Sequence, residues 1–457
     1  MLGLSPLLEM RMKRKGRRNR QDYRMRSAMI DGCYDSRHWE YDHHLIPPIS
    51  SSVAFRLSSL HRGEEGFARF GEGEDICPET IFVYDRLDDP LRGMLEEKLA
   101  YAEGGEVAVS FASGMSAISA ALGVLTKQTD EVIAHNMLYG CTYSLLSHWL
   151  PRYGIQTKFV DLKSTSDLNS ALSEKTKVVY LETPVNPTLD LIDIGAIKNW
   201  LGDINKDRAE DRKVLLVVDN TFATPYCQRP LSLGADLVVH SLTKNIAGFG
   251  TDMGGAVIGP AKYLRDLLLY RKDFGGVLSP KSAWPILVYG LPTLAARMVN
   301  QQKSAQHIAR FLESHSLVKR VLYPGLKSFP QWELAQSQMM SPDGKFSPGS
   351  VLYFELDSEK FTDAPKAVEF FIDYLANNSR CITLAVSLGQ VRTLIEAPYS
   401  MTHSSLPAEF KNSIGVSTCG LRLSLGLEDW HDIENDLEVA LGRTADLITS
   451  PGCAVHP

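Results

Sequence analysis

Short, continuous apolar runs rich in β-branched residues alternate with helical segments over the middle of the chain. This alternation constrains the fold more than any other feature. Because the runs are continuous, they are typical of parallel strands buried on both faces. Strands are predicted at EVAVSFA (106–112), DEVIAHN (130–136), TKFVDL (157–162), KVVYLET (177–183), KVLLVVDN (213–220) and ADLVVHS (235–241), and helices at 115–125, 141–150, 166–173 and 192–203. The sequence therefore predicts an α/β fold with a mostly parallel central sheet covered by helices.

The pattern changes after about residue 290. A long helical segment at 291–315 leads into the strand VLYFEL (351–356) and then into helical segments at 364–376 and 430–447. This mixture predicts a smaller C-terminal α+β domain. We divide the chain into a basic tail (1–26), an arm that includes a polar loop at 61–80 (27–80), a central domain (81–290) and a C-terminal domain (291–457).

Charge is unevenly distributed along the sequence. The 457 residues have a formal charge of −6, but residues 1–26 carry +7 and the remaining residues carry −13. An acidic body argues against nucleic acid as the main partner, because phosphate binding needs a basic face. We interpret the tail as a disordered, solvated segment or as the product of an early start codon. The alternative is a polyanion-binding arm on a non-catalytic scaffolding protein.

Cysteine usage and hydropathy exclude further classes of protein. The seven cysteines are odd in number and contain no C-x-x-C pair, which argues against a disulfide framework or a structural zinc site. We predict no metal site, and a reducing, cytoplasmic compartment fits this usage. No run of 18 apolar residues occurs, so the sequence predicts no transmembrane helix and no membrane partner.

Lys244 is the most informative single residue. It lies in HSLTKNIAGFGTDMGG (240–255), directly after a predicted buried strand. Ligands bind at the carboxyl ends of the strands in open parallel sheets. A partly desolvated lysine amine there can be neutral near pH 7 and can attack an aldehyde. The hydroxyls of Ser241 and Thr243 lie close in the sequence and suit a phosphate.

Other polar residues follow predicted strands in the same way. Asp219 could pair with a protonated ring nitrogen or could cap a helix. Gly114 and Met115 begin a helix whose free N–H groups would bind phosphate, and Tyr139 could stack on a planar cofactor or pack in the core. Asn186 also follows a strand, while Arg422 is a lone cation in an apolar segment and suits a substrate carboxylate.

The joint order of these residues is far more specific than any one of them. From about Tyr84 to Thr444 the chain resembles the Cys/Met-metabolism family of pyridoxal-phosphate enzymes, which has fold type I. The matching segments are YDR (84–86), SGM (113–115), LYGCTY (138–143), ETPVNPT (182–188), VVDNTFATPYCQRPLSLGADLVVHSLTK (217–244), SLGQVRTLIEAPYSMTH (387–403) and LRLSLGLED (421–429). The resemblance makes 81–290 the cofactor-binding domain.

The resemblance also implies a role for each matching residue. Lys244 would hold pyridoxal 5′-phosphate and act as the base, while Tyr139 would stack on the ring and protonate the leaving group. The phosphate would be bound by Gly114, Met115, Ser241 and Thr243, the ring nitrogen by Asp219, and the ring hydroxyl by Asn186. Arg422 and Ser387 would bind the substrate carboxylate. Tyr84 and Arg86 would reach the phosphate of a neighbouring subunit's cofactor, which implies a homodimer with shared active sites, paired into a homotetramer.

Two features favour one activity within the family, the α,γ-elimination of methionine or a related sulfur amino acid to a thiol, ammonia and a 2-oxo acid. They are Cys141 and the pair Lys272–Asp273, both of which resemble methionine γ-lyases near the substrate. The alternatives are a packed cysteine and a surface ion pair. Cystathionine γ-lyase, cystathionine γ-synthase and O-acetylhomoserine sulfhydrylase activities remain alternatives. The segment Asp89-Pro90-Leu91 departs from the N-P-T that usually follows Y-x-R in this family, which puts substrate preference in doubt.

Overall fold

The computed structural model describes residues 24–31, 44–68, 70, 81–402, 404, 409, 411 and 415–449. Residues 1–23, and with them the interpretations of the basic tail, lie outside this description. Met25 begins helix α2 (Met25–Asp31), where Met25, Ala28 and Met29 form a buried apolar face. The prediction of a loop throughout 61–80 is wrong at its start. There helix α3 (Leu60–Ala68) forms, and its Gly63 and Gly66 are buried.

The larger sheet has seven strands in the order β1-β7-β6-β5-β4-β2-β3. Their bounds are β1 Val107–Phe111, β2 Glu131–His135, β3 Gln156–Val160, β4 Thr176–Glu182, β5 Leu215–Asp219, β6 Leu237–Ser241 and β7 Gly255–Gly259. The strands β3, β2, β4, β5 and β6 are parallel, whereas β7 is antiparallel to both of its neighbours. The mostly parallel sheet is therefore confirmed, and β7 is a strand that the sequence did not predict.

Both faces of this sheet are covered by helices. In β4, Val178 and Tyr180 pack in the apolar cluster formed with α5 (Gly114–Leu125) and α11 (Leu264–Phe274). Val179 and Leu181 point to the opposite face and pack with α7 (Thr165–Ala171) and α8 (Ile194–Ile204). This double burial explains why the strands are continuously apolar in sequence.

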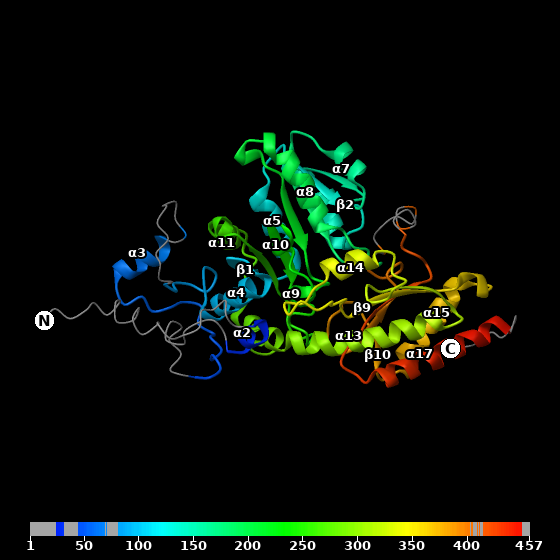
Figure 1. The fold of residues 1–457 in the computed structure, drawn as a ribbon. Helices are drawn as coiled ribbons and strands as arrows, with labels where there is room; N and C mark the ends of the chain where they lie inside the picture. The colour runs from blue at the N-terminus through cyan, green and yellow to red at the C-terminus, as the bar shows by residue number, and fades with distance from the viewer. Residues whose placement is uncertain are drawn as a thin grey trace.

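The C-terminal domain is built on a second, five-stranded sheet of order β10-β11-β12-β9-β8. Its strands are β8 Val318–Leu322, β9 Val351–Leu356, β10 Ile382–Leu384, β11 Thr393–Glu396 and β12 Gly420–Ser424. Helices α15 (Ala364–Asn378) and α17 (Trp430–Thr449) pack with this sheet in one cluster. The long helix α13 (Leu291–Ser314) runs along the lower side of the molecule in Figure 1 and joins the two domains.

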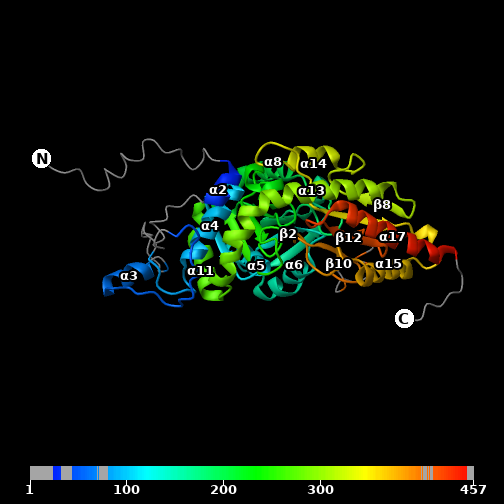
Figure 2. The ribbon, with the colours of Figure 1, turned by 90° about the horizontal axis from the view of Figure 1, so that it is seen from below.

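The remaining helices connect and flank the sheets, and α3 projects from the end of the molecule remote from α15 and α17 in both views (Figure 1, Figure 2). After β2 the chain forms α6 (Gly140–Ser144) and continues through a π-helical turn (Leu145–Trp149) and a 3₁₀ turn (Leu150–Tyr153). The other helices are α4 (Pro90–Glu103), α9 (Thr224–Cys227), α10 (Pro230–Leu233), α12 (Pro280–Pro285) and α14 (Trp332–Gln338). None of the helices described is long and apolar enough to cross a membrane.

The unusual segment Asp89-Pro90 has a local structural explanation. The Asp89 carboxylate accepts a hydrogen bond from the Leu91 N–H and caps α4, and Pro90 occupies its first turn. Burial raises the pKa of Asp89 to about 6. Asp89 and Pro90, which depart from the family pattern, thus form the start of helix α4.

A buried ion pair fixes α4 against α11 and β1. The Arg271 guanidinium, which is fully buried, lies 2.5 Å from Oε1 of Glu96. The same oxygen accepts hydrogen bonds from the N–H and hydroxyl of Ser110. The ion pair therefore links α4, α11 and β1.

We expect Glu96→Ala to lower the free energy of unfolding by about 3–5 kcal/mol, because it leaves the Arg271 charge buried without its carboxylate. Urea unfolding followed by tryptophan fluorescence measures the change. The control is Asp203→Ala, which removes an exposed ion pair with Lys206 and should leave the unfolding midpoint unchanged. Equal destabilisation by both substitutions would contradict the proposed importance of the buried pair.

Candidate active site

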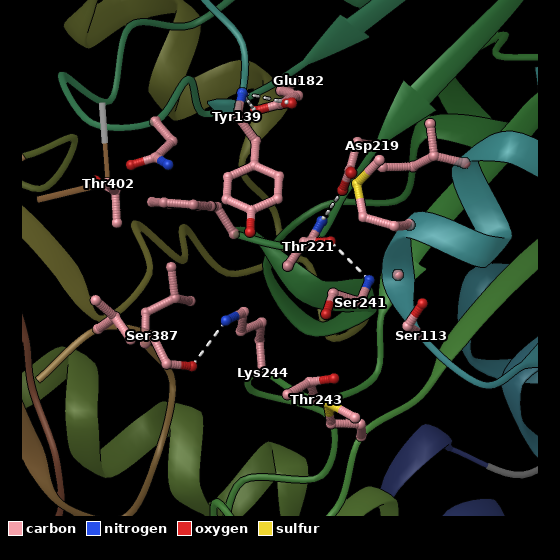
Figure 3. Close-up of a pocket in the computed structure, with 18 of the residues that line it drawn as sticks. Ser113, Tyr139, Glu182, Asp219, Thr221, Ser241, Thr243, Lys244, Ser387 and Thr402 are labelled. Atoms are coloured by element: carbon pink, nitrogen blue, oxygen red, sulfur yellow. Dashed lines mark hydrogen bonds between the residues drawn. The ribbon is translucent and has the colours of Figure 1, made fainter. Parts of the chain in front are cut away.

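A cavity of about 280 Å³ lies at the carboxyl ends of β4, β5 and β6 and is closed by residues of the C-terminal domain. Its lining includes two acidic residues, Glu182 and Asp219, and two basic residues, Lys244 and Arg422. Glu182, Asp219 and Ser241 are the last residues of β4, β5 and β6. Figure 3 shows these three residues on the side of the larger sheet and Ser387 and Thr402 on the opposite side. The position is the one expected for a ligand site in an open parallel sheet.

Lys244 lies in the segment between β6 and β7, and its ammonium donates a hydrogen bond to the Ser387 hydroxyl at 2.7 Å (Figure 3). Burial lowers the pKa of Lys244 from its ordinary 10.5 to about 8, and the nearby Arg422 charge lowers it further than Glu396 raises it back. A sizeable fraction of the amine is therefore neutral in mildly alkaline water. Such an amine is a competent nucleophile toward an aldehyde.

Arg422 lies on β12 and is almost completely buried. Its guanidinium donates to the side-chain oxygen of Asn186 and to the backbone oxygen of Ser387, both at 2.8 Å, and lies 3.1 Å from the Glu396 carboxylate. Burial lowers the pKa of Arg422 while Glu396 opposes this shift. These partners hold the guanidinium at the cavity wall, where it can receive a carboxylate.

The start of helix α5 has the features of an anion-binding site. Ser113 caps the helix by accepting a hydrogen bond from the Ser116 N–H. The N–H groups of Gly114 and Met115 have no protein partner among the described residues and lie at the positive end of the helix. Gly114 is required because an added Cβ would lie 2.8 Å from the Ser241 Cβ. The hydroxyl-bearing residues Ser241 and Thr243 line the same cavity.

Tyr139 and Asp219 lie on the larger-sheet side of the cavity. The Tyr139 ring points into it (Figure 3), and burial together with a hydrogen bond to the Cys141 side chain raises the pKa of the phenol to about 12. Tyr139 therefore keeps its proton at neutral pH. Asp219 accepts hydrogen bonds from the Thr221 N–H at 3.0 Å and from the Tyr180 hydroxyl at 3.4 Å. Burial raises the pKa of Asp219, and these donors oppose the rise.

Five of the predicted site residues do not line this cavity. Arg86 donates to the backbone oxygen of Lys272 at 2.6 Å and lies beside Tyr84, and Lys272 pairs with Asp273 at 3.4 Å. Cys141 faces a neighbouring cavity of about 390 Å³ that it shares with Met115 and Trp149. The other predicted residues are brought together around the cavity: Gly114, Met115, Tyr139, Asn186, Asp219, Ser241, Thr243, Lys244, Ser387 and Arg422.

Sequence reasoning missed two buried acids. Both oxygens of Glu182 accept the Tyr139 N–H, at 2.9 and 3.1 Å, and Glu396 pairs with Arg422. Both lie at strand ends inside motifs that the sequence had already singled out, and that position was the available signal. The apolar lining, which includes Phe222, Met253 and Val386, was also not predicted.

Comparisons with known proteins show the family to which this chain belongs. A family model described as Cys/Met metabolism PLP-dependent enzyme matches residues 35–442. An L-methionine gamma-lyase from Fusobacterium nucleatum subsp. polymorphum is 40% identical over 402 residues, which cover 87% of this chain and 94% of that protein. A cystathionine gamma-lyase from Bacillus subtilis is 38% identical over 363 residues, or 79% of this chain and 89% of that protein.

A solved structure is similar as well. The cystathionine gamma synthase from Xanthomonas oryzae pv. oryzae, determined in complex with aminoacrylate and cysteine, superposes with a TM-score of 0.79 at 32% sequence identity. The match covers 93% of this chain and 99% of that structure. The fold and family that the sequence motifs predicted are thereby confirmed, and this chain belongs to the Cys/Met metabolism family of PLP-dependent enzymes.

Proposed function

We propose that this protein is a carbon–sulfur lyase that catalyses the α,γ-elimination of methionine or a closely related thioether amino acid. The products are a thiol, ammonia and a 2-oxo acid. The observation that carries the proposal is the charge content of the cavity. Asp219 and Lys244 suit the cofactor, Arg422 suits the amino-acid head group, and the side chain of Glu182 is occupied by the Tyr139 N–H, so the remaining lining leaves an uncharged place for the thioether.

The residues present fit pyridoxal phosphate. The partner-free N–H groups of Gly114 and Met115 and the residues Ser241 and Thr243 suit its phosphate. Asp219 suits its ring nitrogen, and Lys244 suits its aldehyde. An anion site, a buried carboxylate and an activated amine around one cavity correspond to the three chemical ends of this cofactor.

Each side chain then has a defined task. Bound pyridoxal phosphate supplies an electron sink for the bonds of the substrate α-carbon. Lys244 Nζ removes the α-proton and moves protons between the α- and β-carbons, which its lowered pKa permits. Tyr139, which stays protonated at neutral pH, donates a proton to the leaving sulfur. Arg422 orients the substrate by its carboxylate.

The apolar lining favours methionine over cystathionine. Phe222, Met253 and Val386 carry no charge and suit a thioether methyl group. Cystathionine would bring a second ammonium and a second carboxylate, which need charged or polar partners. Within the described lining, the acidic and basic side chains already have tasks near the cofactor. The distal ammonium and carboxylate of cystathionine would therefore have no charged partner there.

We also propose that the active enzyme is a homodimer with shared sites, assembled further into a tetramer. Tyr84 and Arg86 lie outside the cavity of their own chain, which supports a task in a neighbouring one. The arm before them exposes apolar side chains: Leu45 is 94% and Ile49 52% accessible. Burial of such a surface against a second copy would stabilise the assembly.

We expect borohydride reduction of the purified enzyme to leave pyridoxal phosphate covalently attached at Lys244. The Lys244→Ala variant should lose this attachment and the absorbance band at the border of the visible and ultraviolet ranges, because no amine remains at that position. Mass spectrometry and absorbance measure both effects. Lys262→Ala, at an exposed lysine outside the cavity, is the control and should behave as the wild type. A wild-type protein that never acquires the band would sink the proposal.

The rate at which apoprotein combines with pyridoxal phosphate should rise with pH, with a midpoint at about 8. Only the neutral amine attacks, so a lowered pKa moves the rise to lower pH than for an ordinary lysine. Arg422→Gln should shift the midpoint upward, because it removes a positive charge that lowers the pKa of Lys244. Stopped-flow absorbance gives the profiles. A midpoint near 10.5 in both proteins would contradict the assigned environment.

Substrate choice is decided by incubating the enzyme separately with methionine, cystathionine, cysteine and O-acetylhomoserine and measuring thiol and 2-oxo acid. We expect methionine to give both products with the highest kcat/KM. Higher kcat/KM with cystathionine would instead favour a cystathionine γ-lyase. A thioether product without 2-oxo acid, formed from O-acetylhomoserine and an added thiol, would favour a γ-replacement enzyme.

A further inference from the structure

Two acidic side chains lie next to each other on the larger-sheet side of the cavity. Glu182 is the last residue of β4 and Asp219 the last residue of β5. The two strands are parallel and these two residues are register partners. Both line the cavity (Figure 3), so their carboxyl groups share one partly desolvated space.

The surroundings of the two groups differ in hydrogen-bond donors. Asp219 receives the Thr221 N–H and the Tyr180 hydroxyl. Glu182, which is 6% exposed, receives the Tyr139 N–H at both of its oxygens. Neither acid forms an ion pair with any residue that the structure describes. The cavity's two cations are engaged elsewhere, Lys244 with Ser387 and Arg422 with Glu396.

Two neighbouring carboxylates with no cation beside them repel each other, and burial raises the free energy of the ionised form of each group. Such a pair retains one proton in common over a wide range of pH. Burial and the Asp219 charge raise the pKa of Glu182 well above its ordinary range, and the smaller opposing effects of the Tyr139 N–H and the Thr142 side chain do not offset this rise. Asp219, which has two separate donors and feels the nearby His240, is the better place for the single negative charge.

Glu182 is also the contact that fixes Tyr139. Tyr139 precedes helix α6, and no side chain caps that helix at its start. The bond from the Tyr139 N–H to Glu182 therefore anchors the backbone from which the phenol enters the cavity. The phenols that face this acid pair, Tyr139 and Tyr180, both have raised pKa values and are neutral.

We propose that Glu182 is held as a neutral carboxylic acid that positions Tyr139 and leaves Asp219 as the sole anion of this pair. Glu182 is thus a positioning residue that acts through its two neighbours. The significance of this arrangement rests on the proposed function, because it is there that Tyr139 and Asp219 have tasks. The protonation state of Glu182 is independent of the proposed function and can be tested in the protein with or without cofactor.

Infrared difference spectroscopy in light and heavy water tests the protonation state. At neutral pH we expect the carbonyl stretch of a protonated carboxyl in the wild-type holoenzyme and in the apoprotein, and its loss in Glu182→Gln. Glu396→Gln is the matched control: Glu396 is also buried but its carboxylate pairs with Arg422, so this substitution should leave the band in place. Absence of the band from the wild type, or its survival in Glu182→Gln, overturns the proposal.

Cofactor spectra and kinetics test the positioning role. Glutamine keeps the shape, neutrality and acceptor of a protonated glutamate, so Glu182→Gln should retain the wild-type cofactor band, its pH dependence and kcat within about twofold. Glu182→Ala should lower kcat by about tenfold or more, with KM less affected, because Tyr139 loses its anchor and general-acid contributions are of this size or larger. If Glu182→Gln shifts the pH dependence of the band, Glu182 is ionised in the wild type and the proposal fails. An enzyme inactive on every sulfur substrate would refute the proposed function and leave the infrared result standing.

Discussion

Parallel pairing of β4, β5 and β6 is the constraint on which the rest of the site depends. It brings Glu182, Asp219 and Ser241 to one edge of the sheet, on neighbouring strands about 5 Å apart. Backbone hydrogen bonds and a double apolar covering fix these positions. The antiparallel β7 returns the chain to the sheet after the segment 242–254, with Gly255 paired to Ser241, so the segment that carries Lys244 is anchored to the sheet at both ends.

The C-terminal domain completes the cavity through a small set of polar contacts. Arg422 on β12 reaches Asn186, which follows β4, and Lys244 reaches Ser387, which precedes β11. Glu396 at the end of β11 supplies the counter-charge that lets the guanidinium remain buried. The two cations of the site are therefore held by residues from both domains, and neither domain alone contains the complete arrangement.

Most strands of the larger sheet and several residues of the cavity could be predicted from the sequence. The six continuous apolar runs correspond to β1–β6, because burial on both faces leaves a plain compositional signal. β7 was missed because GAVIG begins and ends with glycine inside a glycine-rich segment, so its apolar run is interrupted at both ends. Lys244, Asp219 and Arg422 were predicted because each follows or interrupts an apolar run. Glu182 and Glu396 were not, because their importance depends on partners distant in sequence.

Ser387 has an uncommon backbone conformation, with a φ of +94°, and contacts both cations of the cavity. Its hydroxyl accepts from Lys244 and its carbonyl from Arg422. Glycine would adopt this conformation without strain but would lose the hydroxyl, and β-branched residues rarely adopt it. Variation at this position therefore changes the environments of Lys244 and of Arg422 together, and a substitution chosen to alter one of these two side chains will also alter the other.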